Sequence, residues 1–178
     1  MSWESVSFWI EHHPGLASWV QAVGSIASIW GAFAISNKQQ KIQIKLAKKA
    51  ANEKAESLYA VIENAVKTTT TFGELLQTKP SEMVFKDLWQ LVYKQHLESS
   101  VYSLGKLPAH ELGGYEAVRA YSGVMGALTD VVRKVNTYFS SNVFQPSEYF
   151  NMCEETLKQV RFVESNWWSF QQAARRNS

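Results

Sequence analysis

The residue pair closest to a metal-binding motif is His110-Glu111, which opens in the manner of the helical zinc site of metalloproteases. That site needs a second histidine one helical turn after the first, and the required position is occupied by Gly114. The pair His12-His13 has no carboxylate pair or cysteine close to it, so it is better explained as an interfacial segment. We therefore expect no metal site.

Nucleophilic and phosphate-binding motifs are also absent. The sequence has no G-x-x-x-x-G-K-[ST] loop, and neither Ser103-Leu104-Gly105 nor Tyr121-Ser122-Gly123 matches a nucleophile elbow. His96 has no paired acid or nucleophile and is expected to be structural. HEPN-type helical ribonucleases carry an arginine four to six residues before a histidine, and no arginine has a histidine in that window. We expect no enzyme activity, no catalytic residue and no cofactor.

Composition favours one compact domain with an appendage. The chain has 178 residues, of which 46% are apolar and 19% charged, and its net charge of +2 is too small to indicate nucleic-acid binding. The single cysteine, Cys153, cannot form an intramolecular disulfide, which fits a reducing compartment. It lies in an apolar helical pattern and is expected to be a small core residue.

The most distinctive feature of the sequence is a long uncharged run near its beginning. The run Leu16–Ser36 contains no Asp, Glu, Lys, Arg or His. As a helix its 21 residues measure about 32 Å, which matches a bilayer core of about 30 Å. We expect a transmembrane helix over 16–36.

The flanks of this run predict its orientation. Residues 1–15 carry Glu4 and Glu11 but no Lys or Arg, whereas residues 37–54 carry six lysines. The positive-inside rule then places 1–15 outside and 37–178 in the cytoplasm. Part of the segment 1–15 is expected at the membrane interface. Four of the lysines, which share a face, are expected to contact anionic headgroups: Lys38, Lys41, Lys45 and Lys48.

Three other interpretations of the run remain open. It contains Gln21 and several serines, so it could be a buried helix of a soluble protein. It could lie flat in the interface, although it lacks the charged face of such helices. It could be a cleaved signal peptide ending near Ala32-Phe33-Ala34, although the preceding segment is acidic and the apolar stretch is long.

At 100° per residue the run has a bulky side and a small side. The small side contains small-xxx-small spacings, which let helix backbones approach one another in lipid. We expect it to form a homo-oligomer face through Gly24, Ser25, Ser28, Gly31 and Ala32. In such an oligomer a narrow polar path would be lined by Gln21, Ser25 and Ser28.

The remainder is predicted to be all-α, a cytoplasmic bundle of about four helices that continues from the transmembrane helix. The breaks Lys79-Pro80-Ser81, Leu107-Pro108, Gly113-Gly114 and Pro146 separate them. The expected helices are about 37–76, 82–105, 115–140 and 147–174. In the second, Val84, Leu88, Leu91 and Val92 lie on one side. Near the C-terminus, the spacing does not decide whether Trp167 and Trp168 are core or interface residues.

Residues 16–41, including Ser18-Trp-Val-Gln-Ala-Val-Gly-Ser-Ile-Ala-Ser, resemble the anchors of many small single-pass bacterial and prophage membrane proteins. The resemblance implies an inner-membrane protein and supplies no catalytic residue. By analogy, we expect a self-associating membrane effector or pore component, in phage defence or superinfection exclusion. The alternative is a membrane-tethered adaptor that binds a cytoplasmic protein.

Overall fold

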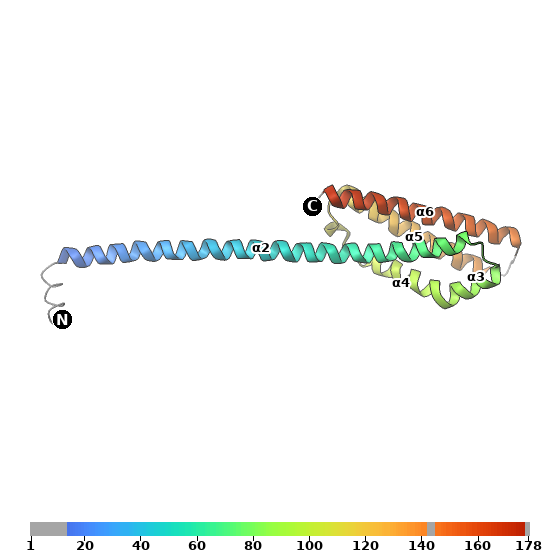
Figure 1. Ribbon diagram of the computed structural model, residues 1–178, viewed down its shortest axis with the longest axis horizontal. Helices are drawn as coiled ribbons and strands as arrows, with labels where there is room; N and C mark the ends of the chain where they lie inside the picture. Colours follow the sequence, from blue (N-terminus) through green and yellow to red (C-terminus); the bar gives the residue numbers. More distant parts are fainter. Residues whose placement is uncertain (1–13, 142–144, 177–178) are drawn as a thin grey trace. The chain divides into compact units, whose positions relative to one another are not determined.

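The computed structural model describes residues 14–141 and 145–176, and these residues form helices and short connections without any strand. The expectation of an all-helical chain is therefore confirmed for this part of the protein (Figure 1). The expected external segment 1–15 lies almost wholly outside it. The elements in chain order are α2 (Pro14–Gln77), α3 (Glu82–Leu88), the π-helix η1 (Trp89–Tyr93), α4 (Lys94–Gly105), the 3₁₀-helix η2 (Ala109–Glu111), α5 (Tyr115–Ser140) and α6 (Pro146–Arg176).

The chain divides into two units, Met1–Asn52 and Glu53–Ser178, and α2 contributes to both. Within the described part of the first unit, α2 is the only element, and side chains from Ser18 to Asn52 are exposed. Its bulky residues include Trp19 at 73% exposure and Trp30 at 74%. Among the described residues, α2 is the one helix long and apolar enough to cross a membrane, and none of its apolar window is buried.

The second unit has a continuous hydrophobic core to which all its longer helices contribute. Helices α5 and α6 pack along each other (Figure 1). The inward side of α5 is apolar or aromatic at every third or fourth residue, and these positions are all buried: Ala117, Tyr121, Val124, Leu128, Val131, Val135 and Tyr138. From α2, Ile62 and Phe72 are fully buried in the same core.

The expected helix 82–105 is interrupted by the π-turn η1, which sequence analysis did not predict. Its large core residues recur every four residues, and an α-helix drifts by about 40° per such step. The wider π-turn corrects this drift. As a result Phe85, Trp89 and Tyr93 all contact Phe72, with ring centroids 5.9, 5.5 and 5.1 Å away, respectively.

The side of this segment singled out by spacing is not the buried one. Val84 is 51% exposed and Leu91 is 83% exposed, whereas Phe85 and Trp89 are buried. The apolar side inferred from Val84, Leu88, Leu91 and Val92 is therefore wrong. The core residues of this segment recur every four residues rather than every 3.6, so a regular α-helical period does not identify its buried side.

The connection between α2 and α3 is held by side chains from α5 and α6. Lys79 adopts a positive φ of 52°, which ends α2, and Pro80 follows. The Tyr149 hydroxyl donates a 2.7 Å hydrogen bond to the Pro80 carbonyl oxygen, and the Tyr138 hydroxyl donates one of 2.7 Å to Glu82 Oε1. These bonds connect the α2–α3 connection to α5 and α6.

Candidate functional site on an exposed helix face

The residues of the predicted oligomer face lie on one exposed side of α2. In a helix, Gly24, Ser28 and Gly31 are three or four residues apart and therefore share a side. Ser25 and Ala32 flank that line, and all five residues are exposed. A methyl group added at Gly24 or Gly31 would meet no atom within 4 Å. This side of α2 is thus open to an approaching helix.

The hydroxyls on this side are already hydrogen-bonded within α2. Ser25 Oγ donates to the Gln21 carbonyl oxygen at 2.9 Å, and Ser28 Oγ donates to the Gly24 carbonyl oxygen at 2.8 Å. This back-bonding lets a hydroxyl sit in an apolar environment without an unsatisfied donor. What Ser25 and Ser28 can still offer a neighbour is acceptor capacity, and Gln21 offers an amide.

The four lysines expected to contact lipid headgroups are all on α2 and exposed: Lys38, Lys41, Lys45 and Lys48. None of them forms an ion pair with another described residue. Their ammonium groups are therefore available to anions in solution or at a surface.

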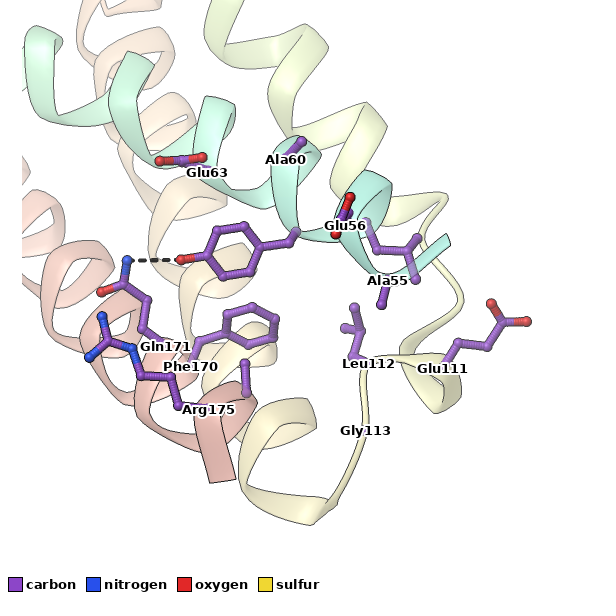
Figure 2. A pocket seen from close by; sticks show the side chains of 13 residues that line it. Ala55, Glu56, Ala60, Glu63, Glu111, Leu112, Gly113, Phe170, Gln171 and Arg175 are labelled. Atoms are coloured by element: carbon purple, nitrogen blue, oxygen red, sulfur yellow. Dashed lines mark hydrogen bonds between the residues drawn. The ribbon is translucent and has the colours of Figure 1, made fainter. Parts of the chain in front are cut away.

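A separate cavity of about 650 Å³ lies in the second unit, between α2, the loop after η2 and the C-terminal part of α6 (Figure 2). Its apolar lining residues include Leu58, Tyr59, Leu112 and Phe170. The Tyr59 hydroxyl accepts a 3.0 Å hydrogen bond from Gln171 Nε2, drawn as a dashed line in Figure 2. The cavity has the size of a small-molecule site.

The charges around this cavity balance one another. Glu111 pairs with Lys54 at 2.6 Å, and Glu63 lies 3.4 Å from Lys67. The two remaining charged lining residues, Glu56 and Arg175, have opposite signs. The cavity therefore presents an apolar floor without a net charge to select a ligand.

The residues with catalytic side-chain types are not brought together. His110 Nε2 lies 3.7 Å from Glu111 Oε1, but its side chain is 82% exposed and Glu111 is held by Lys54. His96 is exposed beside a polar groove that includes Asn64 and Thr68. The described residues contain no cluster of three or more His, Cys, Asp or Glu that could hold a metal ion.

Cys153 is half-buried on α6 next to Tyr149. Burial raises the pKa of the Cys153 thiol, and this outweighs the opposite effect of its hydrogen bond with Tyr149. A thiol with a raised pKa is a poor nucleophile at neutral pH. Its placement agrees with the expected role as a small packing residue.

The structure separates the two adjacent tryptophans. The Trp167 ring is stacked on Phe170 at 5.7 Å and contacts Tyr59 at 4.9 Å, whereas Trp168 is 63% exposed. Sequence analysis missed the Tyr59–Gln171 hydrogen bond and the cavity beside it. The two residues are 112 positions apart, so no local spacing could have indicated that they meet.

Comparison with known proteins adds no relative. No protein-family model, curated protein or solved structure matches the sequence.

Proposed function

We propose that the chain is a self-associating single-pass membrane protein, in which copies pack through α2 and a helical bundle in the cytoplasm controls their assembly. The observation that carries the proposal is the exposed small side of α2, opposite a bulky apolar side that is also exposed. Lipid would cover the bulky side, and a neighbouring copy would cover the small one.

Exposure of the bulky side supports insertion in a bilayer. Soluble proteins rarely expose contiguous apolar patches larger than a few hundred Å². The side chains of Trp19, Ile26 and Phe33 are each at least 57% exposed on α2. A core helix of a soluble protein would bury such side chains against its own chain. Hydrocarbon is the solvent that this side of α2 fits best.

The lysine-rich stretch after the span supports an orientation with residues 37–178 in the cytoplasm. Positive residues within 15–20 positions of a span are retained on the cytoplasmic side. Once there, Lys38 and Lys41 would lie closest to the anionic headgroups and would each stabilise the contact by about 1 kcal/mol.

The small side supports self-association because helix contacts in lipid depend on close van der Waals packing rather than on a hydrophobic driving force. Glycines at 24 and 31 leave room for a neighbouring backbone. In a ring of copies, Gln21, Ser25 and Ser28 would line a polar path. Since both hydroxyls donate within α2, such a path would present mainly oxygen acceptors and the Gln21 amide.

The proposal is tested by expressing the full chain in bacteria and recording membrane potential with a voltage-sensitive dye, together with chemical crosslinking in the membrane. We expect crosslinked multimers and depolarisation. Multimers without depolarisation would rule out a pore and would still support a self-associating membrane effector. A chain that stays monomeric in the membrane would contradict self-association.

One observation favours a second function, that of a membrane-tethered adaptor. The outward side of α6 carries two exposed aromatic residues, Phe162 at 56% and Trp168 at 63%, together with the cations Lys158 and Arg161. Aromatic and arginine side chains are enriched in protein interfaces. A stoichiometric foreign protein that co-purifies with the chain and is lost on Trp168→Ala and Phe162→Ala would favour this function.

A further inference from the structure

The small side of α2 lies on a longer seam that continues past the end of the predicted span. Starting at Gln21, residues on the seam follow alternating steps of four and three without a break. The seam comprises Gln21, Ser25, Ser28, Ala32, Ile35, Gln39, Ile42, Leu46 and Lys49. This is the spacing of the a and d positions of a heptad repeat, which forms the contact line of a coiled coil.

The chemistry of the seam changes where the surroundings are expected to change from lipid to water. Up to Ala32 the seam residues are small or polar, which suits helix packing in lipid. From Ile35 onward it carries Ile35, Ile42 and Leu46, whose exposed fractions are 61%, 50% and 61%. In water, contact between aliphatic side chains stabilises helix association, because it removes apolar surface from the solvent. In lipid this hydrophobic contribution is absent. Each half of the seam therefore has the residue types that favour helix packing in its own surroundings.

We infer that a second copy of this chain covers the whole seam, forming a parallel, left-handed coiled coil that runs from the membrane to about Lys49. The inference rests on the proposed self-association and specifies its geometry. A partner must be a helix that crosses the membrane and continues with the same spacing. A second copy, inserted in the same direction by the same lysines, meets this requirement in register.

The charges flanking the seam are compatible with this arrangement. Lys38 and Lys45 fall at g positions, and in a parallel pair they face neutral e positions such as Gln43 rather than other lysines. Lys41 and Lys48 fall at c, away from the contact. Gln39 lies at an a position of the outer half, and a polar residue at such a position specifies register in coiled coils. Lys49 lies at a d position, where two copies would bring like charges together, so the seam ends there.

A left-handed crossing also selects between two packings of the small side. Contacts through Gly24-x-x-x-Ser28 cross at about −40° in a right-handed sense, which would splay the helices apart beyond the membrane. Heptad contacts cross at about +20° and keep the outer residues Ile42 and Leu46 together. The aliphatic residues of the outer half thus favour the left-handed crossing, in which the contacts within the span recur every seven residues, as from Ser25 to Ala32.

The test is cysteine crosslinking of the full chain in membranes, with Cys153→Ala removing the single native thiol. Single cysteines replace the seam residues Ile42 and Leu46, or the off-seam residues Ile44 and Ala47. Ile44 is the matched control, because it is 63% exposed and lies about 200° around the helix from Ile42. A disulfide forms only when Cα atoms come within about 7 Å, so we expect at least about fivefold more dimer at the seam positions.

Equal crosslinking at all four positions, or a preference for Ile44 and Ala47, would overturn the coiled-coil seam. Crosslinking by an amine-reactive reagent, run in parallel, reports whether copies associate at all. Multimers without seam disulfides would refute this inference and leave the proposed function standing. If neither reagent gives multimers, both fall.

Discussion

Gly73 of α2 lies directly against Val160 of α6: a methyl group placed on Gly73 would come within 2.7 Å of Val160 Cγ1. Val160 is 4% exposed and its branched side chain has little rotamer freedom to move aside. The absence of a side chain at position 73 therefore allows these helices to pack this closely.

We expect Gly73→Ala to destabilise the second unit. Alanine in place of a helical glycine contributes about 1 kcal/mol, but overpacking a buried contact costs about 1–3 kcal/mol, so a net loss of about 1 kcal/mol should appear in denaturant unfolding. Adding Val160→Ala should recover part of the loss through a favourable coupling between the two sites.

Gly126→Ala is the matched control for this prediction, because Gly126 lies in α5 with no atom near the position of an added methyl group. It should raise the free energy of unfolding by about 0.5–1 kcal/mol. If Gly73→Ala stabilised the protein as much as Gly126→Ala does, the close approach to Val160 would not exist in solution.

The tyrosines at the α2–α3 connection predict a loss of stability at alkaline pH. Burial raises the pKa of Tyr138 and of Tyr149 well above their ordinary value, and the hydrogen bond to Glu82 acts in the same direction on Tyr138. The folded protein thus keeps phenol protons that the unfolded chain releases above about pH 10. Stability should be fully present below that pH and fall as pH rises through it.

Replacing both Tyr138 and Tyr149 with Phe should reduce this alkaline loss and, at neutral pH, cost about 0.5–1.5 kcal/mol for each hydrogen bond removed. Tyr102→Phe is the control, because Tyr102 is 68% exposed. Urea unfolding measured from pH 7 to 11 gives the comparison. An alkaline slope that the double variant leaves unchanged would show that these phenols do not carry the effect.

The helices of the second unit could be predicted because proline and glycine residues mark the breaks between them. Pro80 and Pro146 cannot continue a preceding helix, and the structure has helices starting at Glu82 and Pro146. The pair Gly113-Gly114 directly precedes the start of α5 at Tyr115. The π-turn at Trp89–Tyr93 could not be anticipated in the same way. It coincides with the contact of three rings with Phe72, a contact between distant parts of the chain that local periodicity does not indicate.

The candidate site likewise has one part that follows from local spacing in the sequence and another that depends on contacts between distant residues. The small side of α2 depends only on helical periodicity, so Gly24, Ser28 and Gly31 could be grouped from the sequence. The cavity beside Tyr59 depends on where α6 ends and how the loop after η2 is placed, and neither follows from spacing. The spacing of the seam beyond Ile35 is present in the sequence, but the exposure of Ile42 and Leu46 on an unbroken helix is visible only in the structure.

The lysines after the span predict both orientation and lipid dependence. Replacing Lys38, Lys41, Lys45 and Lys48 with Gln should produce molecules in mixed orientations, or weaken binding of this region to anionic vesicles, because about 1 kcal/mol is lost for each charge near the surface. Thiol labelling of cysteines introduced at Ser5 and Ser81, after Cys153→Ala, measures orientation. The unchanged lysine flank should give Ser5 outside and Ser81 inside.

Replacing Lys79, Lys86, Lys94 and Lys106 with Gln removes the same number of charges farther along the chain and should leave the orientation unchanged. If cysteines at Ser5 and Ser81 were labelled from the same side of the membrane in the protein that keeps all its lysines, a single span would be contradicted. Unchanged orientation and unchanged vesicle binding in the quadruple variant at 38–48 would make those lysines an ordinary solvated face.

Substitution of Gly24 and Gly31 tests the packing surface of α2 within the predicted span. Leucine at both positions should hold neighbouring helices apart and remove van der Waals contacts that have no hydrophobic substitute in lipid. Because the methyl groups at these positions meet no atom of the chain itself, the second unit should keep its unfolding free energy. Val23→Leu with Ile26→Leu, on the bulky side, is the matched control and should leave the multimers intact. Native mass measurement in a nonionic detergent distinguishes the outcomes: loss of multimers from the glycine pair alone places the contact on the small side, and equal loss from both pairs would contradict it.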